Sequence, residues 1–560
     1  MTLRVRWLGR VGYDEAQALQ RSLAASRADD HLLLLEHPSV YTLGVRADLG
    51  DVLVPPASVG AELVRTDRGG EVTYHGPGQL IGYPVLTVPG RRGGGLADTR
   101  AYVRSLEQLV IDVLGDLGLA GAGRDDRHPG VWVGGAKICA VGVRLARGRS
   151  THGFALNVDP DLSMFDHIVP CGIRDLDKDV TSLAAQGMPA TMRQVVDAVA
   201  RRAAQQWGAG RSERQDVAWP STGADVSSLG GVPAPGSEPG PDAGTPVRLG
   251  RRLAAAGVTD GLAVTERKPA WLRAPARMGD DYLGLRRTMR GLSLTTVCEE
   301  AGCPNIYECW ADGTATFMIN GARCTRACGF CLVDTSHPLP PEPDEPERVA
   351  EAVGRMGLAH AVVTAVARDD LPDGGAAGFA ETVRAVRRRV PGCAVEVLIP
   401  DCKGDPEALD AILAVRPDVV NHNLETVARL QRAVRPSGGY ARSLAVLARA
   451  KAAGAVTKSG LILGMGERDD EVVGALADLR GVGVDIVTIG QYLRPTRSHL
   501  PVTRWVEPAT FEALARAGEE MGIGHVEASP LTRSSYHARQ AAESVTADPA
   551  CGPAARAPVA

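Results

Sequence analysis

Hydrophobic and polar positions follow different patterns in the two halves of this 560-residue chain. In the first half, apolar runs at 31–36 and 81–88 predict buried strands. Apolar residues at i, i+3, i+4 and i+7 spacing between Val103 and Leu117 predict an amphipathic helix. Two glycines at 134–135 separate VWV from AKICAVGVRL, which predicts a hairpin. The pattern indicates a mixed α/β fold.

Strands and helices alternate strictly in the second half. Six apolar runs predict strands at 316–320, 361–366, 394–399, 419–423, 459–464 and 485–490. Helical patterns fill the intervals, among them 376–389, 441–453 and 469–480. Six βα units predict a parallel sheet, which we expect to form a partial (βα)6 barrel resembling a TIM barrel. Its polar, glycine-rich segments follow the strands, where barrels carry their active sites.

The composition changes between the two halves. Residues 217–261 are rich in Pro, Gly, Ser and Ala and contain few large apolar side chains. Such a segment cannot bury enough surface to offset its ordering entropy. We therefore expect a flexible linker at 217–261, between a domain at 1–216 and a domain at 262–544. A second biased stretch predicts a disordered tail at 545–560.

Composition restricts the class of protein. The chain is 44% hydrophobic and 23% charged, which is typical of a globular protein. Its 62 basic and 66 acidic residues leave a net charge of −4, unlike the basic balance of a nucleic-acid-binding protein. No apolar run has the length of a membrane span, and the N-terminus lacks the apolar core of a signal peptide. We expect a cytoplasmic enzyme or a multidomain binding protein, with neither a nucleic-acid nor a membrane partner.

Six of the eleven cysteines form two triplets. The first has the spacing C-x4-C-x5-C and the second C-x3-C-x2-C, and their members are Cys298, Cys303 and Cys309, and Cys324, Cys328 and Cys331. A structural zinc site takes four ligands, usually in closely spaced pairs. Two four-iron clusters held by three thiolates each would instead leave one open iron apiece. The spacing therefore favours two [4Fe–4S] clusters over zinc, and the missing secretion signal argues against disulfides.

The second triplet follows the first predicted strand of the barrel, and this placement resembles the radical S-adenosylmethionine (SAM) enzymes. The segments VCEEAGCPNIYECW, RDDLPDGG, NHNLETV, SGLILGMGE and RSSYHA narrow the resemblance, over about 268–538, to lipoyl synthases. It implies that the second triplet holds a SAM-binding cluster. The first triplet, with Ser535 as fourth ligand, would hold an auxiliary cluster that donates sulfur. Backbone contacts to SAM are implied for Asp373, Gly374 and Gly375.

The chain departs from this family at several positions. Ala365, Ala367 and Gly378 stand where the family more usually has Ser, Asp and His. Cys402 occupies a position that is commonly aromatic. None of these residues is an expected cluster ligand, so we expect the chemistry to be retained. The cysteines outside the motifs read as structural or incidental, namely Cys393, Cys402 and Cys551.

The first half carries a second set of motifs, RGGEVTYHGPGQL, GGAKICAVGVR, THGFALNV and PCGI. From the residues alone, Cys171 lies on a loop and Lys137 on a hairpin strand. A thiol needs a nearby cation to become an effective nucleophile, and lysine can supply it. Only six of the 62 basic residues are lysine. A structural Cys171 stays an alternative at this point, and Cys139 is the rival nucleophile.

Together these motifs resemble, over about 1–215, the octanoyltransferases that use octanoyl-acyl carrier protein, whose fold is that of biotin and lipoate protein ligases. The resemblance implies that Cys171 carries the octanoyl group as a thioester, and that Lys137 lowers the Cys171 pKa and relays protons. Three loops would line the acyl tunnel: Arg68, Gly69, Gly70, Glu71, Val72, Thr73, Tyr74 and His75; Ala140, Val141 and Gly142; and Gly153, Phe154 and Ala155. His75 is either a packed histidine or a general base.

The two resemblances predict a bifunctional enzyme of lipoate synthesis. Its first domain would move octanoate to a lysine of a lipoyl domain, and its second would insert two sulfurs. The implied partners are octanoyl-acyl carrier protein, lipoyl domains of 2-oxoacid dehydrogenases, the glycine cleavage H protein, and a donor such as flavodoxin or ferredoxin. One alternative joins an ATP-dependent lipoate ligase to a radical methylthiotransferase, and another is an iron–sulfur sensor with a binding module. The RSSYHA ending favours the first interpretation.

Overall fold

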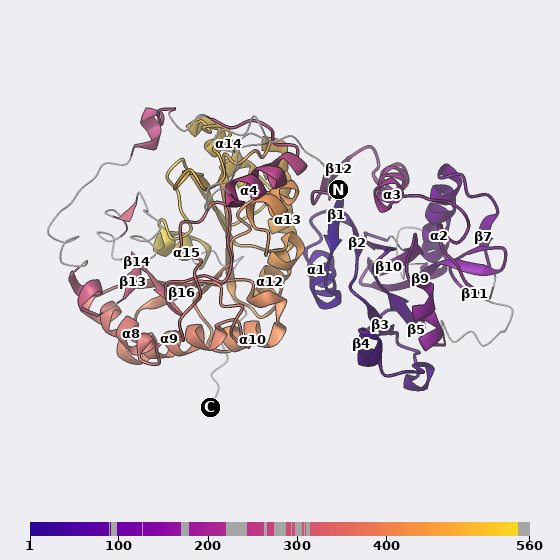
Figure 1. Ribbon diagram of the computed structural model, residues 1–560, viewed down its shortest axis with the longest axis horizontal. Coiled ribbons are helices and arrows are strands. Elements are labelled where there is room, and N and C mark those ends of the chain that lie inside the picture. Colours follow the sequence, from indigo (N-terminus) through magenta and orange to yellow (C-terminus); the bar gives the residue numbers. More distant parts are fainter. Residues whose placement is uncertain are drawn as a thin grey trace. The chain divides into compact units, whose positions relative to one another are not determined.

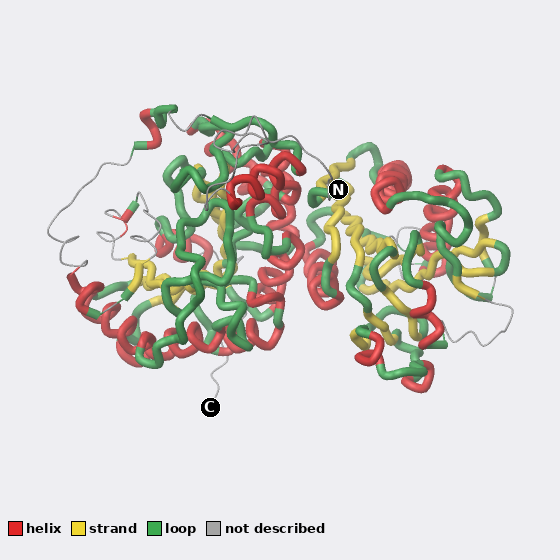
Figure 2. The backbone as a smooth tube through the Cα atoms, viewed as in Figure 1, coloured by secondary structure: helices red, strands yellow, loops and turns green. Residues whose placement is uncertain are grey.

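The computed structural model describes most of the chain. The described residues are 1–88, 90, 98–125, 127–169, 179–219, 244–262, 266–273, 287–292, 294–296, 305–306, 309 and 314–546. They belong to two compact units, Met1–Trp219 and Pro220–Ala560, whose elements are labelled in Figure 1 and coloured by type in Figure 2. Cys171, Cys298, Cys303 and Cys551 lie outside the described residues, so their roles stay predictions.

A mixed sheet forms the centre of the first unit, with strand order β12-β1-β2-β6-β10-β9-β8-β7, and β11 pairs with β9. Its strands are β1 (Leu3–Arg10), β2 (Asp30–Glu36), β6 (Gln79–Val85), β7 (Ala122–Arg124), β8 (Val131–Val133), β9 (Ala136–Ala146), β10 (Arg149–Asn157), β11 (Asp179–Val180) and β12 (Ser212–Asp216). A smaller sheet has the order β4-β3-β5, with β3 (Val40–Leu43), β4 (Glu62–Arg65) and β5 (Val72–His75).

Three α-helices accompany these sheets, α1 (Tyr13–Ser26), α2 (Thr99–Asp116) and α3 (Met192–Trp207), with 3-10 turns at Leu49–Asp51, Pro56–Val59 and Leu162–His167. The helix predicted from apolar spacing is α2, whose Leu106, Leu109 and Val113 are fully buried in the core. The predicted hairpin is β8 and β9, and its turn residues Gly134 and Gly135 both have positive φ. Both predictions are confirmed.

The second unit contains one sheet with the order β13-β14-β15-β16-β17-β18-β19-β20, in which every neighbouring pair is parallel except β13–β14. The six predicted strands are β14 (Thr314–Ile319), β15 (His360–Ala365), β16 (Ala394–Leu398), β17 (Val419–Asn421), β18 (Val456–Leu463) and β19 (Ile486–Gln491). The prediction of six parallel strands missed one, because β20 (His525–Ala528) is a seventh parallel strand among the described residues. At the other edge, β13 (Thr295–Thr296) adds a short antiparallel strand. The polar, half-buried sequence HVEA gave no strand signal.

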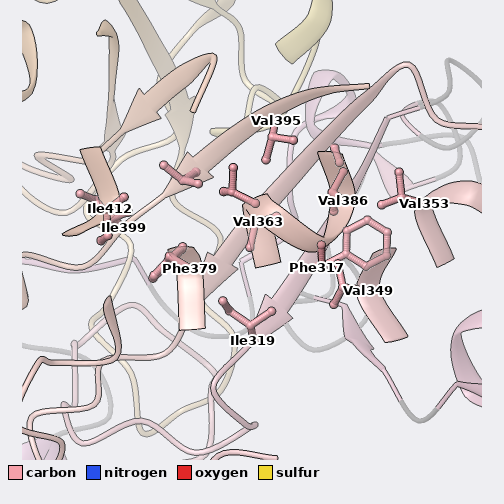
Figure 3. Close-up of a cluster of buried hydrophobic side chains, with 14 of the residues drawn as sticks. Phe317, Ile319, Val349, Val353, Val363, Phe379, Val386, Val395, Ile399 and Ile412 are labelled. Atoms are coloured by element: carbon pink, nitrogen blue, oxygen red, sulfur yellow. The ribbon is translucent and has the colours of Figure 1, made fainter. Parts of the chain in front are cut away.

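Helices cover this sheet along one side, where Figure 1 shows α8, α9, α10 and α12 in succession. The helices of the unit are α4 (Gly244–Ala255), α8 (Glu345–Met356), α9 (Ala376–Arg389), α10 (Pro406–Ala414), α11 (Gln431–Val434), α12 (Tyr440–Ala452), α13 (Asp469–Gly481), α14 (Pro508–Glu520) and α15 (Ala538–Thr546). In Figure 3, the Phe317 ring of β14 lies near Val349 and Val353 of α8 and Val386 of α9, within one buried cluster. Among the described residues, no helix has the length and apolar character that a membrane crossing requires.

Of the expected flexible linker 217–261, the structure describes only the two ends, 217–219 and 244–261, so a flexible linker stays a prediction for the rest. Trp219 stacks on Trp7 with 4.5 Å between ring centroids, so the first unit continues past residue 216. Helix α4 then begins at Gly244, and Leu249 and Leu253 of this helix are buried. Spacing at i, i+4 and i+7 of Leu249, Leu253 and Ala256 carried a helical signal that the average composition of 217–261 concealed. At the other end, α15 continues to Thr546, inside the expected tail.

Candidate active sites

The predicted substrate segments of the first unit come together, but mostly as strands. Residues 140–142 lie on β9 and residues 153–155 on β10, and these strands pair with Gly142 opposite Gly153 and Ala140 opposite Ala155. The expectation that these two segments are loops is therefore wrong. Val72 to His75 form β5, which leaves 68–71 as the one loop of the set. The loops were implied by the resemblance, whereas here the glycines of these segments allow close approach between strands.

Close backbone contacts hold these segments together. The Gly69 amide donates to the Val143 carbonyl at 3.1 Å, and a Cβ at Gly142 would lie 3.1 Å from the Gly69 oxygen. A Cβ at Gly153 would clash with the Gly82 carbonyl, and one at Gly82 would clash with the Phe154 ring. Only glycine fits at 82 and 153 without displacement of a neighbour, which explains why this sequence has glycine there.

Arg68 is buried and makes its described contacts with the segments around it. Its Nη2 donates to the carbonyls of Thr42 at 2.7 Å and Glu71 at 2.8 Å, and its Nη1 donates to that of Gly69 at 3.2 Å. A guanidinium engaged by three carbonyls fixes the turn 68–71. The structure therefore supports Arg68 as the residue that shapes this segment.

His75 is a packed histidine. Its Nδ1 lies 2.8 Å from Gln79 Oε1, and the Gln79 amide nitrogen donates to Asn157 Oδ1 at 2.8 Å. The Gln79 oxygen is thus the acceptor, and we assign the His75 proton to Nδ1. Burial, followed by the neighbouring His37, lowers the pKa of His75 to about 3. So weak a base is poorly matched to proton abstraction near neutral pH, which argues against a general base at this position.

Lys137 lies on β9, is buried, and holds its ammonium 4.9 Å from the centroid of the Trp132 ring. Its carbonyl accepts from the Thr181 amide at 3.0 Å, and Val180 is its partner across β11 and β9. The described chain resumes at Asp179, directly before this pairing, after the segment that contains Cys171. Cys139 is fully buried, which raises the pKa of its thiol well above the ordinary value and argues against the rival nucleophile.

In the second unit, the second cysteine triplet follows β14. The Arg326 amide donates to Cys324 Sγ at 3.4 Å, and the Cys331 amide donates to the Cys328 carbonyl at 3.2 Å. Burial raises the pKa of Cys328 to about 12, with Arg435 opposing the rise and Cys331, Glu425 and Cys324 adding to it. Burial also raises the pKa of Cys331. The three cysteines are half-buried, and clustered thiols of this kind ionise when they bind a cation, as the ligands of an iron–sulfur cluster must.

The described residues contain no group of three His, Cys, Asp or Glu side chains arranged around a single metal ion. The three thiolates of a four-iron cluster each bind a different iron, so they do not need to converge on one point. A [4Fe–4S] cluster at Cys324, Cys328 and Cys331 therefore stays a prediction from their spacing.

Arg326, between the first two cysteines, anchors this loop to two others. Its guanidinium forms a two-pronged pair with Asp369, at 2.7 and 2.8 Å, and contacts the fully buried Asp401 carboxylate at 2.6 Å. Arg326 lowers the pKa of Asp369, and it outweighs burial to lower that of Asp401. Thr325 adds a hydroxyl bond to the Ala367 carbonyl at 2.9 Å. The segments that follow β14, β15 and β16 are thus joined at one side chain.

The DGG segment forms the turn that begins α9. The Asp373 carboxylate accepts from the amides of Gly375 at 3.0 Å and Ala377 at 2.7 Å, so it caps the helix. Gly374 and Gly375 have φ of 61° and 89°, values that favour glycine. The Asn320 side chain donates to the Gly375 carbonyl at 3.0 Å and occupies the space that a side chain at 378 would need. Asn320 thereby accounts for the glycine at 378.

Part of the expected auxiliary-cluster site is described. Asn305 Nδ2 donates to the Leu531 carbonyl at 2.6 Å, and the Cys309 amide donates to the Asn305 carbonyl at 3.0 Å. The Ser534 hydroxyl accepts from Asn423 Nδ2 at 2.6 Å. These bonds bring the segment of Cys309 to the segment that leads into Ser535. The role of Ser535 as a cluster ligand stays a prediction.

Two buried acidic sites did not emerge from the sequence. Glu425 follows β17, has φ of 67°, accepts from Asn423 Nδ2 at 3.1 Å and acts electrostatically on Cys328. Within the sheet, Lys458 Nζ lies 3.1 Å from Glu396 Oε1, and both side chains are fully buried. The sequence features that could have revealed them are an acidic residue directly after a strand, for Glu425, and a single charged residue inside an apolar strand, for Glu396 and Lys458.

The comparisons with known proteins divide the chain in the same way. A model of the lipoyl protein ligase A/B catalytic domain matches residues 12–204. Models of the N-terminal domain of lipoyl synthase of the radical SAM family and of the radical SAM superfamily match 259–303 and 318–479. The lipoyl synthase of Rubrobacter xylanophilus is 57% identical over 278 residues, which are 49% of this chain and 87% of that protein. The lipoyl synthase of Mycobacterium avium is 55% identical over 297 residues, 52% of this chain and 97% of that protein.

Among solved structures, a bi-partite lipoate protein ligase from Thermoplasma acidophilum is similar to this chain at 17% identity. Its TM-score is 0.30, and the match covers 39% of this chain and 86% of that chain.

Proposed function

Because the chain belongs to the lipoyl synthase family of radical SAM enzymes and carries a lipoyl ligase A/B-type catalytic domain before it, we propose that one polypeptide builds protein-bound lipoate in two successive reactions. The first unit transfers octanoate from octanoyl-acyl carrier protein to a lysine of a lipoyl domain. The second unit then inserts two sulfur atoms into the octanoyl chain. The observation that carries the proposal is the presence of both catalytic domains in one chain.

For the first reaction, we propose Cys171 as nucleophile and Lys137 as its cationic partner. The Cys171 thiolate attacks the thioester of octanoyl-acyl carrier protein, and the carrier leaves as a thiolate that takes a proton from the Lys137 ammonium. The neutral amine of the acceptor lysine then attacks the enzyme thioester, gives its proton to the Lys137 amine and regenerates the Cys171 thiolate. The buried Lys137 ammonium beside Trp132 supports this role, because a fixed cation stabilises a thiolate.

For the second reaction, we propose two [4Fe–4S] clusters. Cys324, Cys328 and Cys331 would hold the SAM-binding cluster, and the first triplet with Ser535 would hold the sulfur-donating one. When bound, SAM and its cluster supply a radical that removes hydrogen from an unactivated carbon. In this chain, Arg326 fixes the ligand loop, while Gly374 and Gly375 form the turn that we expect to meet SAM.

The acceptors would be the lipoyl domains of 2-oxoacid dehydrogenases and the glycine cleavage H protein. A flavodoxin or ferredoxin would deliver the electrons. We propose the cytoplasm as the site of action, because free thiols and reduced clusters persist in a reducing compartment.

The first reaction is tested by trapping the thioester. The enzyme is mixed with octanoyl-acyl carrier protein without ATP, and its intact mass is measured. We expect the gain of one octanoyl group, which hydroxylamine removes and which Cys171→Ala does not acquire. A requirement for ATP, with octanoate transferred equally well by Cys171→Ala, would instead identify a ligase.

The second reaction is tested after anaerobic reconstitution. We expect about eight irons per chain and a gain of two sulfurs on a pre-octanoylated lipoyl domain in the presence of SAM and reductant. Replacement of all three cysteines of the first triplet should halve the iron and preserve SAM cleavage. A methylthio group on RNA or protein, or a loaded cluster that never cleaves SAM, would contradict the proposal.

A further inference from the structure

The segment that ends the connector between the units packs directly against the ligand loop of the second cysteine triplet. Gly329 lies between Cys328 and Cys331 in this loop. A Cβ at Gly329 would lie 2.7 Å from Leu500 Cγ and 3.2 Å from Leu249 Cδ2. Leu249 belongs to α4 and is 7% exposed. An apolar side chain from the connector therefore covers the backbone of the ligand loop.

The same segment is fixed at its other end. Val258 is buried, and its Cγ2 would lie 2.5 Å from a Cβ at Gly466. Arg429 donates to the carbonyls of Ala256 and, at 2.7 Å, of Gly466. The Leu262 amide donates to the Val502 carbonyl at 2.7 Å. Residues 249–262, called the clasp below, are thus anchored on several loops of the second unit.

Among the described residues, hydrogen bonds from α11 and from 499–500 support the ligand loop on the side where the clasp packs. The Gly329 amide donates to the Val434 carbonyl at 2.9 Å, and the Gly329 carbonyl accepts from the Leu500 amide at 2.9 Å. His499 Nε2 lies 2.8 Å from the Cys331 carbonyl. These bonds hold the loop at α11 and at 499–500, while Leu249 packs over the same backbone. Without the clasp, the bonds of Gly329 would lose an apolar cover against water.

We propose that the clasp is a positioning element for the radical cluster: it holds the backbone between Cys328 and Cys331 in place and shields these ligands from water. The identity of the bound cluster rests on the proposed function, whereas the contact between the clasp and the loop does not. A connector that merely joined the two units would leave the ligand loop unaffected when its packing is changed. If the clasp positions the loop, a change in the packing of the clasp should alter the ligand loop.

Hydrogen exchange of the full-length apo protein measures this coupling without any cofactor. We expect Leu249→Ala and Val258→Ala to accelerate exchange in the peptide that contains residues 324–331 by about tenfold or more, because fewer contacts oppose local opening. Leu339→Ala is the matched control, since Leu339 is 66% exposed. Leu249→Met, which conserves side-chain volume, should restore protection. After reconstitution, the two Ala variants should also release iron to a chelator faster than Leu339→Ala.

The decisive comparison is between the clasp and the ligand loop. If the amides of α4 exchange faster in Leu249→Ala while residues 324–331 keep the wild-type rate, the proposal is overturned. A variant too unstable to purify is replaced by a protease site within residues 221–243. Cutting there leaves the clasp attached to the second unit, so we expect unchanged hydrogen exchange in residues 324–331. Faster exchange after the cut would show that the covalent connection to the first unit, and not the clasp, protects the loop, and would overturn the proposal. If the Ala variants exchange faster at residues 324–331 but the wild-type enzyme inserts no sulfur, the proposed function is refuted and the role of the clasp in holding the loop is retained.

Discussion

The two units position their catalytic residues by different means. In the first unit, the segments expected to bind substrate lie mostly on paired strands, where glycines at 82, 142 and 153 let backbones meet. In the second, the expected cluster ligands Cys324, Cys328 and Cys331 lie on a loop, and the Arg326 guanidinium joins that loop to Asp369 and Asp401. The close approach of strands in the first site therefore depends on the absence of side chains, whereas the loops of the second site are joined through buried charge.

The two units also bury different titratable groups. His31, His37 and His75 of the first unit are buried, and burial lowers the pKa of each, to about 3, 4 and 3. The second unit pairs its buried charges, as Lys458 does with Glu396, where the lysine holds the glutamate pKa low despite burial. Acid should therefore act on the two units differently.

The largest expected effect separates the two chemistries. Cys171→Ser should abolish octanoyl transfer, because a serine hydroxyl does not ionise appreciably at neutral pH, and should leave sulfur insertion into a pre-octanoylated domain intact. Cys328→Ala should do the reverse, because the SAM-binding cluster loses one of three thiolates. Each folded variant is assayed for both reactions. Transfer at near wild-type rate by Cys171→Ser would remove the nucleophile assignment.

Acidification should destabilise the first unit more than the second. A histidine whose folded pKa lies below the unfolded value of about 6.5 is protonated first in the unfolded state, so stability falls as pH drops from about 6.5 toward about 4. Each such histidine lowers the unfolding free energy by up to about 1.4 kcal/mol per pH unit, so three of them lower it by up to about 4 kcal/mol per pH unit.

His422, which burial holds at a pKa of about 4, is one such group in the second unit. Hydrogen exchange, followed separately in the two units between pH 6.5 and 4.5, should show the steeper loss of stability in the first. His75→Gln should reduce that slope by about one group's share. Equal slopes in both units would contradict this account.

Arg326→Gln tests the charge-based anchor. Removing one partner of a buried pair leaves an uncompensated charge, so we expect the second unit to lose about 3–5 kcal/mol of unfolding free energy and to bind less iron. Arg384→Gln is the matched control, because Arg384 and Glu381 are both about half exposed and such pairs contribute about 0–1 kcal/mol. Equal effects of the two substitutions would show that Arg326 is no anchor.

The smallest expected effect concerns the glycine-based site. Gly153→Ala introduces a Cβ that meets the Gly82 carbonyl, and we expect about 1–3 kcal/mol of destabilisation of the first unit together with slower octanoyl transfer. Gly115→Ala has no atom within 4 Å of the new Cβ and lies on α2, where alanine is favoured by up to about 1 kcal/mol. Denaturant unfolding should therefore show a lower unfolding free energy for Gly153→Ala and a higher one for Gly115→Ala. A neutral Gly153→Ala would mean that the strands can separate at no cost.

Much of the fold was predictable because its patterns are local. Helix α9 has the predicted bounds, and the six predicted strands of the second unit occur within a few residues of their expected limits. The missed strand β20 is short and polar, and α4 was hidden within a composition dominated by Pro and Gly. Local patterns do not show which polar side chain meets which.

The candidate sites were predictable in part. The triplet at Cys324 was identified by its spacing and lies within the region that the radical SAM model matches, and its role as a cluster site stays a prediction. The pairing of Arg326 with Asp401 depends on loops that are distant in sequence, so no local pattern could reveal it. The same holds for the packing of His75, whose environment comes from Gln79 and Asn157.

One chain should perform both reactions on the same acceptor. The direct test mixes the reconstituted enzyme anaerobically with octanoyl-acyl carrier protein, an apo lipoyl domain, SAM and reductant, without ATP or free lipoate, and measures the intact mass of the lipoyl domain. The account predicts a domain that carries the octanoyl chain with two added sulfurs. A domain that stays unmodified, or one that gains octanoate but no sulfur while the clusters are loaded and SAM is cleaved, would contradict it.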